Sequence, residues 1–250
     1  MFAVAGARVF ALGRDEVKTQ AVVDAINAAC GASRVSFVAC DLSSLASVRS
    51  AAAAINAARV PLHVLLNNAG VMALPERSVT TDGFEMQLGT NHIGHFVLTN
   101  ALTPALQAGS PSRIVNVSSK AHWRSGIEFD DMMLEQKYDG WRSYGQSKTA
   151  NILHAVELQR RLGAEGITAV ALHPGVITDS DLWRHAGKVM QANKSVPQGA
   201  ATSVYCAVAP GLTGGAYYED CSEQNTAEWA TNPAFAERLW AESEKLTAVE

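Results

Sequence analysis

The chain has 250 residues, of which 48% are hydrophobic, and its formal net charge is −4 at pH 7. This length and apolar content suffice for one large domain with a substantial core, while the acidic balance without any basic run argues against nucleic-acid binding. No stretch of about 18 apolar residues occurs, so no membrane span is expected, and four cysteines without Cys-x-x-Cys spacing favour a reducing, cytoplasmic compartment.

Strand and helix patterns alternate along the chain without a linker or repeat. This order predicts an α/β fold with a doubly wound parallel sheet, in a single domain that spans the chain. The first strand is expected at Arg8–Leu12, followed by an alanine-rich helix near Glu16–Ala29. Val35–Cys40 is the next expected strand. It leads into Asp41, a residue that could cap a helix over Ser44–Ala58.

Polar residues follow the next two expected strands. Leu62–Leu66 is a buried strand that breaks into the turn Asn67-Asn68-Ala69-Gly70, and Ile114–Val117 ends in two serines, the second being Ser119. Asn91 opens a helical stretch between them, where a plain helix N-cap is the alternative interpretation. Open α/β sheets bind ligands at the carboxyl ends of their strands, so these polar groups are expected to share one site.

The run from Tyr144 to Lys148 adds a chemical pattern to that site. In a helix the two side chains share one face, so the phenol and the ammonium would project into the same cleft. A nearby ammonium is expected to lower the pKa of Tyr144 from its reference of about 10, which makes the phenol a candidate general acid or base. Alone, this spacing is more typical of a solvated helix face. The neighbouring strand-end residues favour the chemical interpretation.

The C-terminal part of the chain continues the same alternation. A strand at Thr168–Leu172 meets the turn His173-Pro174-Gly175, and the last strand is expected at Ala216–Tyr218. Lys120–Arg142 is expected to be a long loop beside the site. Residues from about 178 to 196 are a candidate lid, because loops of this length are usually functional or disordered.

In order, these motifs resemble those of the short-chain dehydrogenase/reductase family, and more narrowly its retinol-dehydrogenase-like and WW-domain-oxidoreductase-like branch. The likeness runs from about Ala5 to Leu246 and implies a Rossmann-like sheet. It also implies an NADP(H)- or NAD(H)-dependent oxidoreductase that interconverts an alcohol and a carbonyl on a small lipophilic substrate. The motifs that carry it are Asn67-Asn68-Ala69-Gly70, Asn91-His-x-Gly-His-Phe, Val117-Ser118-Ser119, Tyr144-x-x-x-Lys148 and His173-Pro174-Gly175.

The resemblance implies a role for each of four catalytic candidates. Ser119 would orient the substrate oxygen, and Tyr144 would exchange a proton with it. Lys148 would lower the pKa of Tyr144 and hold the nicotinamide ribose. Asn91 would bind a water molecule that links Lys148 to solvent.

The resemblance also implies a set of cofactor contacts. Asp41 and Leu42 would lie beside the adenine ring, while the strand-end turn would shape the cofactor groove. The expected contacts in and after these turns are Asn67, Ala69, Gly70, Pro174, Gly175 and Ile177, with Thr178 a weaker candidate because the family spacing is not kept there. Each of these residues could instead serve only as a turn former.

Arg14 bears on the choice of cofactor. It follows the strand Arg8–Leu12, where an acidic residue would receive the ribose of NAD. A guanidinium pairs instead with a 2′-phosphate, so NADP(H) is favoured over NAD(H), with an ordinary surface arginine as the alternative. Among the seven histidines, His92 and His95 could form half of a metal site. No further ligand stands at suitable spacing, so no metal is expected.

The family pattern begins with a strand, a Thr-Gly-x-x-x-Gly-x-Gly turn and a helix, and no such run precedes Arg8. That strand would lie in the middle of the sheet, so a gap or closure is expected there, with low stability and weak or no NADP(H) binding. A membrane anchor ahead of Met1 stays open. The rival interpretation of function is a catalytically impaired relative that acts as an interaction or binding module.

A homodimer is expected by family analogy. Its interface would be formed by the helix after Asn91 and the helix over Tyr144–Arg161. An apolar stripe remains on the latter helix once the site face is assigned, and it consists of Ile152, Ala155, Val156 and Leu162. The alternative is that this stripe is buried against the sheet.

Overall fold

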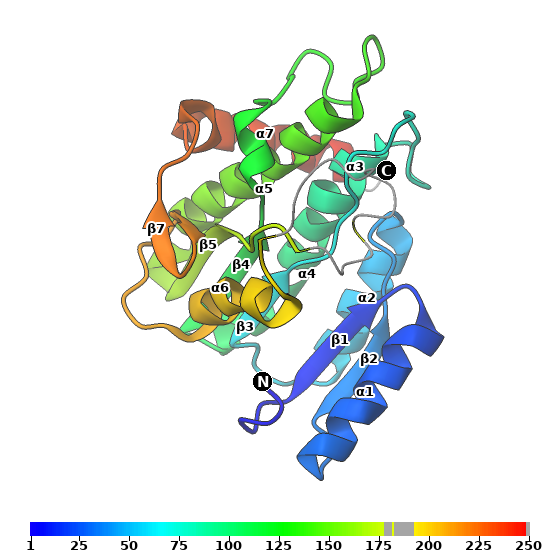
Figure 1. The fold of residues 1–250 in the computed structure, drawn as a ribbon, viewed down its shortest axis with the longest axis vertical. Coiled ribbons are helices and arrows are strands. Elements are labelled where there is room, and N and C mark those ends of the chain that lie inside the picture. The colour runs from blue at the N-terminus through cyan, green and yellow to red at the C-terminus, as the bar shows by residue number, and fades with distance from the viewer. Residues whose placement is uncertain (178–181, 183–192, 249–250) are drawn as a thin grey trace.

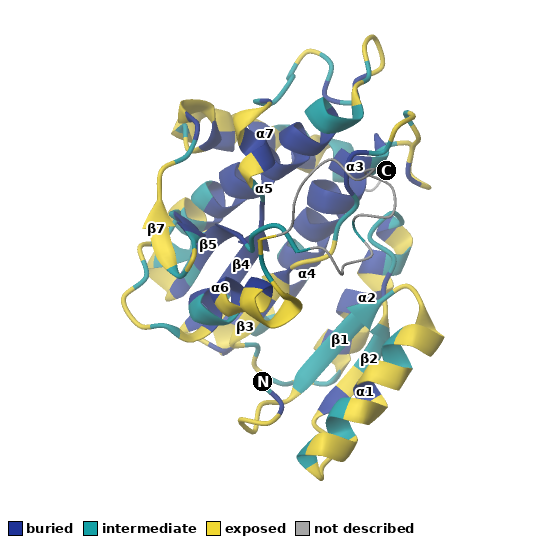
Figure 2. Ribbon diagram, in the orientation of Figure 1, coloured by how far each residue is buried: buried dark blue, intermediate teal, exposed yellow. Residues whose placement is uncertain are grey.

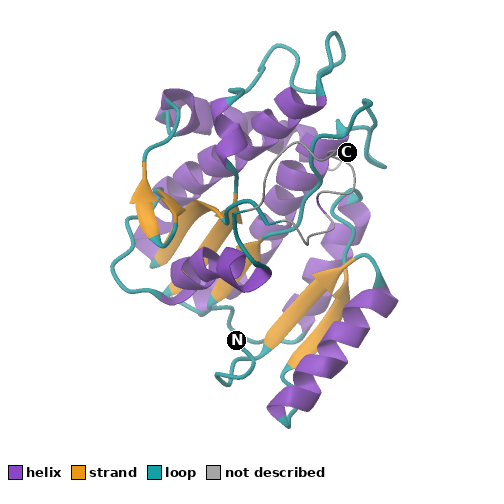
Figure 3. Ribbon diagram, viewed as in Figure 1, coloured by secondary structure: helices purple, strands orange, loops and turns teal. Residues whose placement is uncertain are grey.

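The computed structural model describes residues 1–177, 182 and 193–248. They form an α/β fold in which helices cover both faces of mostly parallel strands (Figures 1 and 3). The strands are β1 (Val9–Gly13), β2 (Val35–Ala39), β3 (Val64–Asn67), β4 (Ser112–Val117), β5 (Ile167–His173), β6 (Tyr217–Glu219) and β7 (Ser222–Gln224). The helices are α1 (Glu16–Cys30), α2 (Leu45–Ala57), α3 (Met86–Leu88), α4 (Gly94–Ala108), α5 (Gly140–Leu162), α6 (Val196–Val208) and α7 (Pro233–Thr247).

The strands are divided between two sheets. β1 pairs with β2, and a second sheet has the order β3-β4-β5-β6-β7, in which only β6 and β7 are antiparallel. β1 and β3 do not pair with each other, so each keeps one edge without a strand partner (Figure 1). The predicted doubly wound α/β sheet is therefore confirmed, and the predicted gap lies between β1 and β3.

Side chains alternate along β5 and give each face of the larger sheet its own core. Ala169 belongs to a large cluster shared with α2, α4 and α5, whereas Val170 and Leu172 pack with Cys206 of α6 on the opposite face. On the smaller sheet, Val23 of α1 packs against Val35 of β2. The larger sheet is thus covered on both faces, as strands in parallel sheets require.

Helix α7 packs along α5 (Figure 1). The apolar stripe of α5 is already used inside the chain: Ile152 and Ala155 are fully buried against Ala171 and Tyr217 of the sheet, while Val156 and Leu162 pack partly on the main core. The stripe therefore follows the alternative interpretation, burial against the sheet. The stripe no longer supports a dimer, which stays a prediction.

Several element boundaries differ from those expected from the sequence. Ser44, not Asp41, caps α2, because the Asp41 carboxylate accepts hydrogen bonds from the backbone and the hydroxyl of Ser43 instead. The expected loop ends at Gly140, where α5 begins. A further strand, β7, follows β6 across a tight turn. Within the described part of the chain, the longest helices are not apolar enough to cross a lipid bilayer.

Candidate active site

The carboxyl ends of the β3–β7 strands gather most of the predicted polar residues. Ser119 directly follows β4, and Tyr144 and Lys148 lie one turn apart on the buried face of α5. Tyr144 and Lys148 are each only 4% exposed. The Ser118 hydroxyl donates to the carbonyl of Lys148 at 2.6 Å, so the end of β4 is tied to the helix that carries the other two side chains.

Lys148 is held over Tyr144 and next to the predicted cofactor turn. Its Nζ donates to the carbonyl of Val117 at 3.1 Å and lies 5.5 Å from the centre of the Tyr144 ring. A Cβ at Gly70 would come within 3.5 Å of the same Nζ and within 2.7 Å of Asn91 Oδ1. Only glycine fits at position 70, and its bare backbone forms one wall beside the ammonium.

Asn91 lies inside a helix, not at its start. The helical run begins at α3, whose N-cap is Glu85, and residues Gly89–Ile93 form a π-helical turn between α3 and α4. The Asn91 amide binds both backbone groups of Val71, at 2.8 and 2.9 Å, and donates to Ser147 Oγ at 2.9 Å. The N-cap alternative is therefore wrong. The side chain instead braces the turn after β3, and π-turns occur frequently at functional sites.

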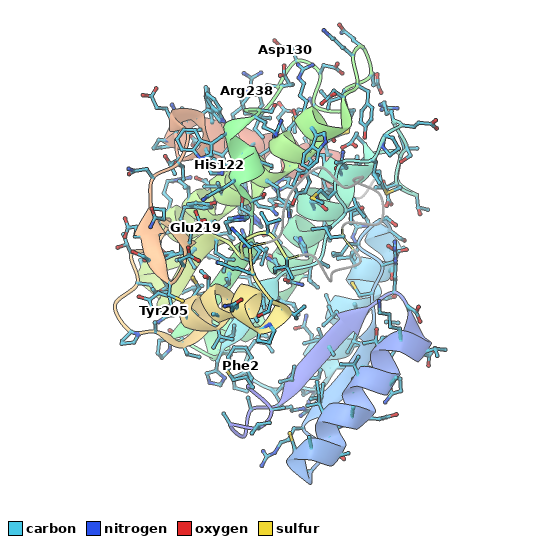
Figure 4. The ribbon with its side chains drawn as sticks, in the orientation of Figure 1. Phe2, His122, Asp130, Tyr205, Glu219 and Arg238 are labelled. Carbon is cyan, nitrogen blue, oxygen red and sulfur yellow. The ribbon has the colours of Figure 1, made fainter. Side chains whose placement is uncertain are left out.

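Ser119 is fixed by a short 3-10 turn formed by Lys120–Trp123. Its hydroxyl accepts from the backbone of Ala121 at 3.1 Å, and its carbonyl accepts from His122 Nδ1 at 2.6 Å. His122 is buried on the side of the molecule that also carries Glu219 of β6 (Figure 4). Lys120 forms an ion pair with Glu219 at 2.7 Å, so this turn is anchored to β6 as well.

The electrostatics of the site correct one expectation. Burial raises the pKa of Tyr144 to about 12, a rise that hydrogen bonding to Ser119 partly opposes. Burial also lowers the pKa of Lys148 to about 8. The expected lowering of the Tyr144 pKa is wrong here, because both groups are desolvated and the ammonium lies over the ring while bonded to Val117. Near neutral pH the phenol therefore keeps its proton.

Only some of the residues predicted to line the cofactor groove lie near one another in the structure. Leu42 lies against Gly94 of α4, close to the π-helical turn, and Asp41 precedes it in a tight turn with Ser43. Asn67 ends β3 and donates to Thr99 Oγ1 and Asn116 Oδ1, so its side chain is committed to the core. Ala69 is exposed at the turn between Asn67 and Gly70.

A second group of predicted contacts follows β5. Gly175 has a φ of +95°, which favours glycine, and a Cβ there would run into Lys194. The ammonium of Lys194 donates to the carbonyl of Pro174 at 3.3 Å. Ile177 pairs with Lys194 in an isolated bridge and packs on Gly199 of α6. Thr178 and most of the predicted lid lie outside the described residues.

Arg14 lies apart from this group. It is exposed just beyond β1, and among the described residues it makes no hydrogen bond or ion pair. Its neighbour Asp15 caps α1 by accepting from the backbone of Lys18 at 2.9 Å. A carboxylate at this helix N-terminus repels phosphate. No glycine-rich turn leads into a helix within the described ranges, so we assign no pyrophosphate contact.

An apolar wall around Tyr144 was not singled out by the sequence. Met72, Ala73 and Ala121 are buried against the Tyr144 ring, with Trp141 and Leu182 packed on the same cluster. Trp141 meets the ring edge to face at 6.1 Å between centroids. The sequence signals were the apolar residues of the expected loop and lid, Trp141 and Leu182 among them, and the apolar run that follows Gly70, which is also typical of ordinary core.

The two spaced histidines of α4 and its preceding turn make protein contacts. His92 Nε2 bonds to Ser243 Oγ of α7 at 2.9 Å, and His95 Nδ1 donates to the carbonyl of Asn91 at 2.9 Å. Across the described residues, His, Cys, Asp and Glu side chains form no group of three that could hold a metal ion.

Comparison with known proteins decides the family. The model of the short chain dehydrogenase family matches residues 1–190. The chain belongs to this family. This short-chain dehydrogenase is retinol-dehydrogenase-like: it is 40% identical to human retinol dehydrogenase 12, over 98% of this chain and 79% of that protein. It is likewise 42% identical to mouse polyprenol dehydrogenase, over 97% of this chain and 77% of that protein.

Solved structures of other proteins have the same fold. A crystal structure of an uncharacterised protein from Mycobacterium paratuberculosis matches with a TM-score of 0.80 and 36% identity, covering 98% of this chain and 85% of that chain. Carbonyl reductase from chicken fatty liver, solved with NADPH bound, matches with a TM-score of 0.61 and 25% identity, covering 84% of each chain. The fold of this short-chain dehydrogenase is thus one on which NADPH-bound enzymes are built.

Proposed function

We propose that this chain is an NADP(H)-dependent oxidoreductase that interconverts an alcohol and a carbonyl group on a small lipophilic substrate. The observation that carries the proposal is the convergence of Tyr144, Lys148 and Ser119 at the carboxyl end of β4. Asn91 braces the adjoining turn. Family membership and retinol- and polyprenol-dehydrogenase relatives support the same reaction class.

In the reducing direction Tyr144 acts as the general acid. Its pKa of about 12 keeps the phenol protonated, so it can donate a proton to the carbonyl oxygen of the substrate. The Ser119 hydroxyl donates a hydrogen bond to the same oxygen and fixes its position. Donation leaves a tyrosinate at position 144, and in the oxidising direction this tyrosinate accepts the proton of the alcohol. The hydride would be supplied or accepted by a nicotinamide cofactor when one is bound.

Lys148 serves as the buried cation of the site. A pKa of about 8 keeps it mostly protonated at neutral pH, and its Nζ faces the bare backbone of Gly70. A ribose hydroxyl could approach Lys148 there, where any side chain at position 70 would collide with Asn91. The described residues thus fit the nicotinamide end of the cofactor. Arg14, beyond β1, is the proposed partner of a 2′-phosphate.

The proposed substrate is lipophilic because the wall beside Tyr144 is apolar. Met72, Ala73, Ala121 and Trp141 pack in one apolar cluster with Tyr144. Apolar surface of this kind recognises the hydrocarbon body of a substrate while Ser119 and Tyr144 recognise its oxygen. The names of the curated relatives, a retinol and a polyprenol dehydrogenase, are consistent with this class.

Tyr144→Phe tests the function directly. We expect turnover to fall roughly 10²–10⁴-fold because only the proton-transfer group is removed, with NADPH binding changed by less than about threefold. Tyr205→Phe on α6 is the matched control and should retain full turnover. Wild-type turnover in Tyr144→Phe would remove Tyr144 from the mechanism. NADPH binding with no turnover of any carbonyl by the wild type would favour a binding module.

We also propose a homodimer and a cytoplasmic site of action. The dimer rests on family analogy, since the α5 stripe is consumed within the chain. Light scattering at micromolar concentration tests it, and a monomeric mass would end the proposal. The cytoplasmic site rests on the four cysteines, all of which are free thiols.

A further inference from the structure

Gln87 is a fully buried polar side chain at the junction of three segments that form the site. It belongs to α3, is 0% exposed, and uses both ends of its amide. A buried amide retains its place only when its donors and acceptor are satisfied, and here all the partners lie outside its own helix. None of the sequence motifs includes Gln87.

The acceptor end of Gln87 holds the apolar wall. Its Oε1 accepts from the backbone N–H of Ala73 at 2.7 Å. Ala73 has a φ of +48°, a left-handed conformation that is uncommon for residues other than glycine and that needs support from its surroundings. Ala73 and the preceding Met72 are buried against the Tyr144 ring. This hydrogen bond therefore supports both the strained backbone at Ala73 and the wall that it presents.

The donor end of Gln87 holds the start of α5. Its Nε2 donates to the carbonyl of Gly140 at 2.9 Å and to Tyr138 Oη at 3.2 Å. Tyr138 Oη in turn donates to the carbonyl of Leu74 at 2.9 Å. Gly140 is the first residue of α5, and a Cβ there would collide with the Leu74 carbonyl. The loop after Gly70 and the beginning of α5 are thus pressed together around this amide.

The position of Gln87 is itself fixed. Glu85 caps α3, with its two carboxylate oxygens accepting from the backbones of Gln87 and Leu88 at 3.0 and 2.7 Å. Asn91 follows Gln87 by four residues in the same helical run, and it binds Val71 two residues before Ala73. The helical run that holds Gln87 and Asn91 therefore makes three connections. Asn91 binds Val71, and Gln87 binds both Ala73 and the first residue of α5, Gly140.

We propose that Gln87 is a positioning residue that sets the spacing between the Met72–Ala73 wall and Tyr144. Gln87 does not touch the reacting atoms. It holds the Met72–Ala73 segment at a fixed distance from α5, the helix that carries Tyr144. The inference rests on the proposed function for its catalytic consequence. Only an amide serves, since the site needs an acceptor for Ala73 and donors for Gly140 and Tyr138 at once.

Gln87→Met tests the inference, because it keeps the length of the side chain and removes every hydrogen bond. We expect the Ala73 amide to exchange with deuterium at least tenfold faster, and kcat for decanal reduction to fall at least tenfold. The Kd of NADPH should change less than twofold. Gln159→Met is the matched control: its Oε1 also accepts a backbone N–H, from Ala169, but far along α5. It should leave Ala73 exchange and kcat unchanged.

Tyr138→Phe provides a second variant if Gln87→Met does not fold. It removes only the hydroxyl that joins Gln87 to Leu74, so smaller changes in the same direction are expected. Unchanged Ala73 exchange and unchanged kcat in the folded variants would overturn the inference. If the wild type reduces no carbonyl, the proposed function fails, and Ala73 exchange alone then decides whether Gln87 holds the wall.

Discussion

The two sheets of the molecule differ in how deeply their strands are buried. β4 and β5 are almost entirely buried, whereas every residue of β1 is only half-buried (Figure 2). The proposed proton-transfer residues lie on the deep sheet and its helices, while Arg14, the proposed selector of cofactor, lies exposed beyond β1. The proposed proton transfer and the proposed choice of cofactor therefore depend on parts of the fold that differ in burial.

Low pH should destabilise mainly the part of the fold around the larger, more deeply buried sheet. Burial lowers the pKa of His92 to about 3 and of His95 to about 4, so the unfolded chain, with histidine near 6.5, binds more protons in acid. The two neutral histidines leave the free energy of unfolding at its full value above about pH 6.5. Stability is lost as the pH falls toward 4. Together, these two histidines should lower the free energy of unfolding by roughly 2.7 kcal/mol per pH unit in that window, and the buried His122, His154 and His173, whose pKa values burial also lowers, should act in the same direction.

Urea unfolding at a series of pH values measures this loss. A free energy of unfolding that stays constant from pH 6.5 to 5 would show that the two buried histidines carry no such penalty.

Paired truncations should reproduce the difference in burial. Leu172→Ala removes a fully buried side chain of β5 and should lower the free energy of unfolding by about 2–5 kcal/mol. Leu12→Ala on β1 should cost only about 1 kcal/mol, because this side chain is half-buried. Denaturant curves on both variants compare them. Equal losses of stability in the two variants would contradict the expected difference between the sheets.

Arg14→Asp probes the shallow region alone. Replacing the guanidinium by a carboxylate should weaken NADPH about tenfold or more and NADH much less, since only NADPH carries the 2′-phosphate. Fluorescence titration with each nucleotide gives the two constants. Arg8→Asp, a charge reversal just before β1, is the control. If both nucleotides weaken equally at position 14, Arg14 is only a surface residue.

The strands that end in polar residues were predicted well from the sequence, because each is an apolar run followed directly by turn-forming side chains. The sequence placed Ser119, Tyr144 and Lys148 in one site, and the structure brings them together. The sequence suggested Asp41 as the cap of the helix over Ser44–Ala58, whereas the structure uses Ser44; both residue types are good caps, so residue type alone does not identify the one that is used. The short, fully exposed β7 has no apolar alternation that could predict a strand.

Properties that depend on how deeply a side chain is buried could not be predicted from the sequence. The sequence shows that Lys148 follows Tyr144 by one turn, but not that both are nearly fully buried, and burial reverses the direction of the Tyr144 pKa change. The π-helical turn around Asn91 was not predicted, because the Val71 backbone groups that the Asn91 side chain binds lie 20 residues away in the chain. Gln87 was missed for the same reason: its partners are distant in the chain.

The unpaired edges of β1 and β3 also give the native chain a point of weakness. No inter-strand hydrogen bond joins β1 and β2 to the larger sheet, so the β1–α1–β2 unit is held by side-chain packing: β2 packs on α2, which packs on α4, and Phe10, Leu12 and Val38 lie against the main core. Such a unit can open while β3–β7 stays folded. Limited digestion with a protease under native conditions should therefore cut first within β1–α1–β2 and leave a resistant core that carries Ser119, Tyr144 and Lys148.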